Sequence, residues 1–236
     1  MTHYISLKNQ KALIDSLDWD ILVILDACRF DTFEILYREY LDGSLDKCWS
    51  LGSETPEWFR KTFDKFYNVV YFSANPYITS KETDKFYMVM DVWRFAWNDT
   101  YGTVLPSKMN EVVKSVSFRL PIIVHYIQPH FPYIGRVKLL SFLLHHPDRQ
   151  LCGEQKKRIE FFKKHPEVVR VAYTENLKVV LSSVSELIDY FKDKRIVITA
   201  DHGEAFGEEG VYFHPPKKDI KILREVPWFR VEGDAT

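Results

Sequence analysis

The sequence predicts an α/β sandwich in which a mostly parallel central sheet carries helices on both faces. Short, continuous apolar runs recur at residues 20–26, 68–73, 121–127 and 195–201, as expected for strands that are buried on both faces of a parallel sheet. Longer amphipathic stretches separate these runs. Strand signals that alternate with helix signals in this way are typical of α/β proteins.

The clearest helix signal spans residues 174–191. Its apolar residues repeat at helical spacing along one face, at Leu177, Val180, Leu181, Val184, Leu187, Ile188 and Phe191. We expect this face to cover one side of the sheet. The basic stretch before it, residues 154–167, is interpreted as a solvated helix face rather than as a contact for an anionic lipid or substrate.

The chain is predicted to be a single domain. Its 236 residues lie near the upper end of the size of one domain. It contains no internal repeat, low-complexity tract or Gly/Ser linker, so nothing marks a domain boundary. Residues 136–166 are rich in His and Lys and poor in strand signals. We therefore expect them to form an insertion or lid between two core strands.

Composition and charge exclude several classes of function. The formal net charge of -1 gives no global attraction to nucleic acid. No apolar run approaches the roughly 20 residues needed to span a membrane, and the N-terminal pattern is not that of a secretory leader. The three cysteines, Cys28, Cys48 and Cys152, are widely spaced and form no CxxC pair. This usage favours a reducing, cytoplasmic location.

Polar side chains with metal-ligand chemistry lie at the ends of three predicted strands. Asp26 closes the first run, His125 and His130 lie at and beyond the end of the third, and Asp201 and His202 close the fourth. Ligands of open α/β sheets bind beyond the carboxyl ends of the strands. Carboxylate and imidazole donors suit zinc, manganese or a similar dication. The sequence therefore predicts a divalent-metal site at this edge.

Each aspartate alone has a simpler interpretation, because Asp often caps the helix that follows a strand. This alternative is weaker for the two aspartates together. Asp201 is followed directly by His202, Gly203 and Glu204. Such a cluster behind a buried strand favours metal binding over capping.

The segment TADHGEAFGEEGVYFH, residues 199–214, resembles the DHGE segment of the alkaline phosphatase superfamily. The resemblance is closest to the branch that holds sulfatases, lipoteichoic acid synthases and phosphoethanolamine transferases. It implies an alkaline phosphatase-like sandwich fold in which Asp201 and His202 ligate the catalytic metal. It also implies that His214 contacts a second metal or the substrate.

Three further segments carry the same resemblance in the order expected for the family. HYIQPHFPY, residues 125–133, is similar to the stretch H-x(4)-H-x-P-Y, which implies that His130 faces the substrate. DACRFD, residues 26–31, is similar to the D-x-x-R-x-D after the first strand, which implies that Asp26 is a metal ligand. REVPW, residues 224–228, is similar to the last core strand. The resemblance therefore spans nearly the whole chain.

Family members place a nucleophile at a helix N-terminus after the second strand, and the only candidate segment is SLGSETPEWF, residues 50–59. Thr55 precedes Pro56, a residue favoured at the first helical position, so we expect Thr55 at the N-cap with its oxygen toward the site. Its spacing from Gly52 resembles the G-x-x-T of phosphoethanolamine transferases. Ser53 is a second candidate for the attack, and in a third interpretation Thr55 is a structural cap only.

The resemblance also implies a mechanism. One tightly held zinc or manganese ion would be bound by Asp26, Thr55, Asp201 and His202, with a weaker second site at His130 and His214 for which no carboxylate is assigned. The Thr55 hydroxyl would attack phosphorus in line and form a phosphothreonine. Water or an acceptor alcohol would then release the phosphoryl group.

The substrate is predicted to be a small-molecule phosphate or sulfate ester. The sulfatase motifs C-x-P-x-R and S-x-P-x-R do not occur, which favours phosphate over sulfate. We therefore expect a metal-dependent hydrolase of phosphate mono- or diesters. A phospho-substituent transferase, a sulfatase and a non-catalytic metal-bound scaffold are the alternatives. Arg29 would bind a phosphoryl oxygen or pair with Asp31, and the sequence favours neither role.

Overall fold

An eight-stranded sheet forms the centre of the computed structural model, which describes residues 8–81, 84–139 and 154–232. The strands follow the order β1-β3-β12-β9-β2-β8-β4-β5. Neighbouring strands are parallel except at β12, which runs antiparallel to β3 and β9. Their bounds are β1 Lys8–Asn9, β2 Ile21–Leu25, β3 Gly43–Trp49, β4 Tyr67–Ser73, β5 Phe86–Asp91, β8 Ile122–Tyr126, β9 Ile196–Thr199 and β12 Glu225–Val231.

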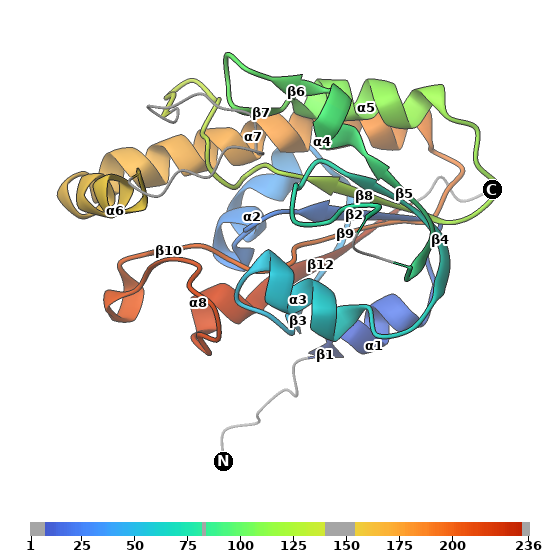
Figure 1. Cartoon of the computed structure of the whole chain (residues 1–236), viewed down its shortest axis with the longest axis horizontal. Helices are drawn as coiled ribbons and strands as arrows, with labels where there is room; N and C mark the ends of the chain where they lie inside the picture. The colour runs from blue at the N-terminus through green and yellow to red at the C-terminus, as the bar shows by residue number, and fades with distance from the viewer. Residues whose placement is uncertain (1–7, 82–83, 140–153, 233–236) are drawn as a thin grey trace.

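Helices cover both faces of this sheet, with α5 and α7 on one face and α1 and α3 on the other (Figure 1). The helices are α1 Gln10–Asp15, α2 Phe30–Leu36, α3 Thr55–Thr62, α4 Val92–Phe95, α5 Pro106–Ser115, α6 Glu154–Lys164, α7 Pro166–Tyr190 and α8 Lys221–Arg224, with 3-10 turns at Tyr37–Glu39 and Glu208–Gly210. Two small antiparallel pairs lie outside the main sheet, β6 Trp97–Asn98 with β7 Thr103–Val104 and β10 Ala205–Phe206 with β11 Tyr212–Phe213. The predicted α/β sandwich with a mostly parallel sheet is confirmed.

The four apolar runs of the sequence form adjacent strands in the middle of the sheet. β2 lies between β8 and β9, and β4 lies on the far side of β8. All five residues of β2 are buried, because helices cover the strand from both sides, and this is why its sequence is continuously apolar rather than alternating. These four strands are parallel. Their carboxyl ends therefore meet at one edge of the sheet.

Three of the described strands of the main sheet, β1, β3 and β5, were not predicted, and β1 consists of two exposed residues only. In β3, of sequence GSLDKCW, only Cys48 is fully buried. In β5, at the edge of the sheet, only Phe86 is buried. Half-solvated strands of this kind lack the continuous apolar run that marks the central strands. The segment similar to the last core strand does form a strand, β12.

The predicted helix at residues 174–191 forms most of α7, which begins earlier, at Pro166. Proline is tolerated in the first turn because the N–H groups there have no partner within the helix. Among the described residues, no helix has the length and apolarity required to cross a membrane. Cys28 and Cys48 are buried free thiols, and Cys152 lies outside the described residues.

A second apolar cluster lies beside the main core. Phe162 of α6 packs with Val169 and Tyr173 of α7 and with Phe206 of β10. Thus α6 has a buried side, while Lys163 and Lys164 are exposed, as expected for a solvated basic face. Of the predicted insertion or lid, residues 140–153 lie outside the described residues.

Candidate active site

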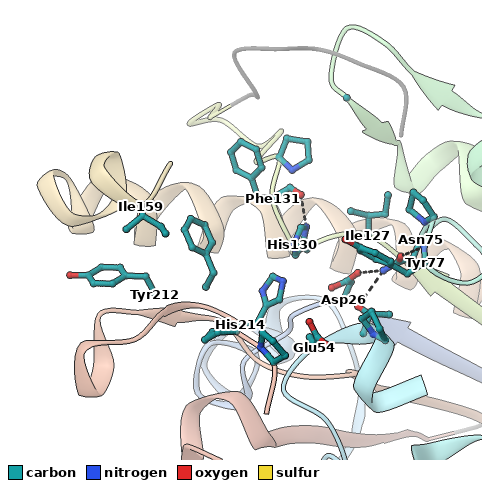
Figure 2. A pocket seen from close by; sticks show the side chains of 18 of the residues that line it. Asp26, Glu54, Asn75, Tyr77, Ile127, His130, Phe131, Ile159, Tyr212 and His214 are labelled. Atoms are coloured by element: carbon teal, nitrogen blue, oxygen red, sulfur yellow. Dashed lines mark hydrogen bonds between the residues drawn. The ribbon is translucent and has the colours of Figure 1, made fainter. Parts of the chain in front are cut away.

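The carboxyl edge of the sheet brings together residues from several strands and one helix. Asp26 follows β2, Asn75 follows β4, and Asp201 with His202 follows β9. Thr55 enters from the first turn of α3. Figure 2 shows the site from close by, with Asp26 and Asn75 joined by a hydrogen bond at its centre.

The four residues predicted as metal ligands lie against one another. Thr55 Oγ1 donates a hydrogen bond to Asp201 Oδ2 over 2.7 Å and lies 3.4 Å from His202 Nε2. His202 Nε2 lies 3.4 Å from Asp201 Oδ2 and 3.7 Å from Asp26 Oδ1. All four side chains are buried. The structure thus brings Asp26, Thr55, Asp201 and His202 into one cluster, which we call the first cluster.

His125 adds another donor to the first cluster. Its Nε2 lies 4.0 Å from Asp26 Oδ2 and 3.9 Å from Asp201 Oδ2 and, among the described residues, has no hydrogen-bond partner although it is buried. Its Nδ1 lies 2.7 Å from the hydroxyl of Tyr71, which orients the ring. A buried ring nitrogen without a partner costs free energy. A cation bound between these side chains would satisfy it.

The protonation states of the first cluster suit a divalent cation. Burial lowers the pKa of His125 to about 4 and lowers that of His202 well below its usual value, so both rings are neutral near pH 7. His202 Nδ1 donates to the Gly203 carbonyl oxygen over 2.8 Å, which leaves the Nε2 lone pair toward the cluster. Burial and the charge of Asp201 raise the pKa of Asp26 well above its usual value. A bound dication would relieve this repulsion between carboxylates.

Asn75 is a site residue that the sequence analysis missed. Its Nδ2 donates to Asp26 Oδ2 over 2.5 Å and lies 3.3 Å from Thr55 Oγ1. The side chain is buried and lines the cleft. It lies just beyond the second apolar run, residues 68–73 in β4, and this position at the carboxyl end of a buried strand is the signal that could have identified it.

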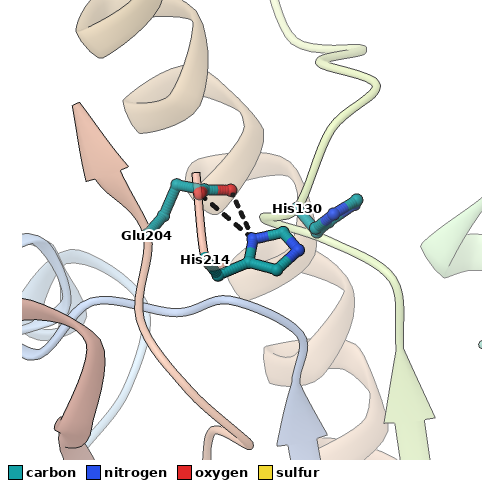
Figure 3. Close-up of side chains that lie close together, drawn as sticks. All are labelled: His130, Glu204 and His214. Carbon is teal, nitrogen blue, oxygen red and sulfur yellow. Dashed lines mark hydrogen bonds and ion pairs between the residues drawn. The ribbon is translucent and has the colours of Figure 1, made fainter. Parts of the chain in front are cut away.

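His130, Glu204 and His214 form a second cluster beside the first (Figure 3). His214 Nδ1 lies 3.1 Å from Glu204 Oε1, and the ring centroids of His130 and His214 are 5.0 Å apart. One ligand atom of each residue lies within 4.8 Å of the others. The ring of His214 is also 4.5 Å from that of His202. Glu204, which is fully buried, thus places a carboxylate beside the two histidines for which the sequence analysis had assigned none.

The first turn of α3 presents Thr55 to the first cluster. The expected N-cap position of Thr55 is wrong by one residue, because Glu54 has the extended backbone of the cap and Thr55 is already helical. Pro56 fits either register, since N–H groups throughout the first turn lack helical partners. Before the turn, a Cβ at Gly52 would collide with the backbone nitrogen of Trp58. This close approach requires glycine.

Ser53, the competing candidate for the attack, is placed elsewhere. Its Oγ donates to the Pro215 carbonyl oxygen over 2.8 Å, lies 3.1 Å from Glu57 Oε2 and accepts from the backbone nitrogen of Lys218 over 3.1 Å. Ser53 is fully buried and is not among the residues that line the cleft. These contacts hold the loop at residues 215–218 against α3.

Glu57 stabilises the same turn through its carboxylate. Oε2 accepts from the backbone nitrogen of Ser53 over 3.0 Å and Oε1 accepts from Lys61 Nζ over 2.6 Å. Burial alone would raise the pKa of Glu57, but these bonds and that from the backbone of Lys217 lower it from 4.5 to about 2. A carboxylate whose pKa is lower in the folded state stabilises the fold above its unfolded pKa. This stabilisation is lost as the pH falls through the folded pKa.

Glu57→Gln is therefore expected to lower the free energy of unfolding near pH 7 by on the order of 2 kcal/mol. It should also flatten the loss of stability between about pH 5 and pH 2. Urea unfolding of both proteins at several pH values measures this. Glu111→Gln, which removes an exposed carboxylate paired with Lys108, is the control and should change stability little. Equal pH dependence in the wild type and Glu57→Gln would contradict the assignment.

Gln10 connects the helix that bears Thr55 to the strand that precedes Asp201. Its Nε2 donates to Thr199 Oγ1 over 2.9 Å and to the Ala200 carbonyl oxygen over 2.6 Å. Its Oε1 accepts from Trp58 Nε1 over 2.8 Å. The side chain is fully buried. Gln10 thereby fixes the start of α3 relative to the end of β9.

The guanidinium of Arg29 is engaged by the protein. It pairs with Asp31 over 2.6 Å and with Glu208 over 2.8 Å, and it donates to the Glu204 carbonyl oxygen over 3.1 Å. Arg29 is buried and is not among the residues that line the cleft. Of the two roles left open by the sequence, these contacts favour the ion pair with Asp31.

A cleft of about 400 Å³ opens over both clusters. The polar side chains that line it at the two clusters are those of Asp26, Thr55, Asn75, His130 and His214. Its walls are largely apolar and include Tyr77, Trp97, Ile127, Phe131, Ile159, Tyr212 and Phe213. A cleft of this size, with a few converging polar groups, suits a small-molecule ligand.

Comparisons with known proteins find similar solved structures. No family model and no curated protein matches the sequence. The integral membrane lipooligosaccharide phosphoethanolamine transferase EptA from Neisseria meningitidis superposes with a TM-score of 0.53 at 17% identity, over 89% of this chain and 47% of EptA. The chain thus spans about half the length of that protein.

Two further structures are similar. The periplasmic domain of EcEptC from Escherichia coli, in complex with Zn, has a TM-score of 0.54 at 15% identity, over 91% of this chain and 72% of that domain. BT4656, in complex with its substrate D-glucosamine-2-N,6-O-disulfate, has a TM-score of 0.57 at 12% identity, over 90% of this chain and 70% of BT4656. These likenesses show that the chain has the fold of EptA, EcEptC and BT4656, in agreement with the alkaline phosphatase-like sandwich that the sequence motifs implied.

Proposed function

We propose that this chain is a metal-dependent hydrolase of phosphate esters in which Thr55 is the nucleophile. The observation that carries the proposal is the hydrogen bond of 2.7 Å from Thr55 Oγ1 to Asp201 within the buried first cluster. A threonine in the first turn of a helix, against carboxylate and imidazole groups and beside an open cleft, is arranged for attack on a bound ester.

The first cluster fits a divalent cation, zinc or manganese. Asp26, Thr55, Asp201 and His202 would hold it. The Nε2 of His125, which has no hydrogen-bond partner in the described part of the chain, lies 4.0 Å from Asp26 in the same region. The second cluster, which combines two imidazoles and a carboxylate, fits a second cation. The zinc-bound domain of EcEptC supports the choice of zinc. When bound, the cation would lower the pKa of the Thr55 hydroxyl and offset charge on the phosphoryl oxygens.

The residues of the chain have separate roles in the proposed reaction. Thr55 Oγ1 attacks phosphorus, and a Thr55–phosphorus bond forms as the bond to the leaving alcohol breaks. Asp201 Oδ2 already accepts the hydrogen bond of this hydroxyl and is placed to take its proton. The leaving oxygen takes a proton from solvent, or from His214 when no cation occupies the second cluster. Asn75 Nδ2, 3.3 Å from Thr55 Oγ1, would donate to a phosphoryl oxygen.

Water completes the cycle in a hydrolase. It attacks phosphorus of the phosphothreonine, the phosphorus–Thr55 bond breaks, and the oxygen of Thr55 regains a proton. A transferase is the second candidate, and it differs only in that an acceptor alcohol takes the place of water. The structural likeness to EptA, which is named a phosphoethanolamine transferase, favours this alternative. Both candidates share the step at Thr55.

Protein supplied with zinc or manganese is expected to release the alcohol from aryl phosphate or bis-aryl phosphate faster than from aryl sulfate. Chelation of the metal should abolish this release. In a hydrolase, the alcohol appears in water alone, whereas a transferase needs an added acceptor alcohol and yields its phosphorylated product. Faster turnover of aryl sulfate would indicate a sulfatase. The absence of turnover for all three esters in metal-loaded protein, with and without acceptors, would favour the non-catalytic scaffold.

A further inference from the structure

We propose that the cleft selects phosphate diesters over dianionic phosphate monoesters and that Glu54 is the residue that sets this selectivity. This inference rests on the proposed function, because it names the substrate class of the same site. A diester carries one negative charge. A phosphate monoester above about pH 7 carries nearly two, since its second pKa is about 6.

The charge of the cleft disfavours a dianion. None of the described residues that line it is Lys or Arg, and the side chains with formal negative charge are Asp26 and Glu54. Arg29 is buried in ion pairs with Asp31 and Glu208. The carboxylates of Asp26 and Asp201 would balance the charge of a dication in the first cluster. Within this part of the structure, no fixed protein cation offsets the second charge of a monoester. Each additional negative charge in a partly dehydrated cleft costs Coulomb energy.

Glu54 is the carboxylate best placed to act on substrate charge. It directly precedes Thr55, is only partly buried, and lines the cleft. It lines the same cleft as Asn75, His130 and His214. Asp26 belongs to the first cluster and is committed to Asn75 and the cation site. Glu54 is not a member of the first cluster.

The apolar walls provide space for two substituents. Figure 2 shows Ile159 and Tyr212 on one side of the polar centre and Tyr77 and Ile127 on the other, with Asp26 and Glu54 between them. A phosphate diester has two carbon-bearing groups on phosphorus, and each would contact one wall. A monoester can cover only one of them. Apolar contact on both sides adds binding energy that only the diester gains.

The experiment compares bis(4-nitrophenyl) phosphate with 4-nitrophenyl phosphate at about pH 8, where the monoester is a dianion. Wild-type protein loaded with zinc or manganese is expected to show the higher kcat/KM on the diester. Glu54→Gln should raise kcat/KM on the monoester relative to that on the diester by on the order of 10-fold. Glu209→Gln, which neutralises an exposed carboxylate outside the cleft, should leave this ratio unchanged.

A wild-type preference for the monoester, or an equal effect of Glu54→Gln on both esters, would overturn the proposal. 4-Nitrophenyl sulfate distinguishes the effect of substrate charge from the effect of the second substituent, because it is a monoanion with one substituent. It should be a poorer substrate than the diester. If the sulfate equals or exceeds the diester, the assignment of the second substituent is wrong.

Binding makes the test independent of turnover. In metal-loaded Thr55→Ala, diphenyl phosphate is expected to bind more tightly than phenyl phosphate by calorimetry at about pH 8. The added Glu54→Gln change should reduce the ratio of the two dissociation constants by on the order of 10-fold. Turnover without diester selectivity would refute this inference alone and leave the proposed hydrolase intact. Selective binding without turnover of any ester would support the cleft assignment and refute the proposed hydrolase.

Discussion

Thr55→Ala is expected to abolish turnover of a phosphate ester while the protein still folds and binds metal. The hydroxyl of Thr55 donates to Asp201 within the first cluster, and its loss removes the covalent route altogether. A purely structural role of Thr55 predicts a small loss of stability rather than a loss of turnover. Loss of the buried hydrogen bond to Asp201 alone would cost roughly 1 to 3 kcal/mol of stability and leave the chemistry largely intact. Thr55→Ser should retain some activity, because a serine hydroxyl can attack from nearly the same place.

Intact-mass analysis after acid quench during turnover is the direct measurement. Wild-type protein should carry a phosphoryl group that maps to residues 50–59, and Thr55→Ala should not. Ser53→Ala is the matched control, since Ser53 lies in the same segment but contacts Pro215 and Lys218 rather than the first cluster. It should remain active and become phosphorylated. Phosphate on Ser53 would transfer the role to that residue, and full activity in both variants would end the covalent mechanism.

Asp201→Asn is expected to weaken metal binding by at least about 100-fold. Asp201 contacts three other groups of the first cluster, Thr55, His202 and His125, through Oδ2. Its Oδ1 accepts from the backbone nitrogens of Ala27 and His202 over 3.0 and 2.9 Å. Asparagine can keep the Oδ1 bonds, so the loop should fold. It lacks the charge that holds a dication, so catalysis should be lost with the metal.

Elemental analysis of purified protein, followed by titration of the metal-free protein with zinc, measures this loss. Asp219→Asn is the control, because Asp219 is an exposed carboxylate that pairs with Arg224. It should retain the wild-type metal content. A near-stoichiometric metal in Asp201→Asn, with unchanged affinity, would remove Asp201 from the ligand set.

The apolar runs were sufficient to predict the central strands and the fold class. β2, β4, β8 and β9 are buried by helices on both faces, and each such strand has a local pattern that a single sequence contains. β3 and β5 could not be found in this way, because their side chains are half-solvated. The place of β3 depends in addition on long-range pairing with β12, for which propensity is a weak guide.

The site residues also fall into those marked by a local pattern and those that depend on long-range contacts. Asp26, Thr55, Asp201 and His202 could be named because each lies at a strand end or a helix start within a recognisable motif. Asn75 and the roles of His125 and Glu204 depended on contacts between segments far apart in the chain. The Asn75–Asp26 bond joins residues 49 positions apart.

The sequence by itself determined the α/β class, the central strands and the carboxylate and imidazole side chains at their carboxyl ends. It did so because burial, helix starts and metal-ligand chemistry are local properties of the chain. Only the tertiary structure decided that Thr55 rather than Ser53 faces Asp201, that Arg29 is held by Asp31 and Glu208, and that Glu54 lines the cleft. These outcomes depend on which side chains meet across the fold. Such meetings are set by packing and charge pairing among distant residues, which no local pattern specifies.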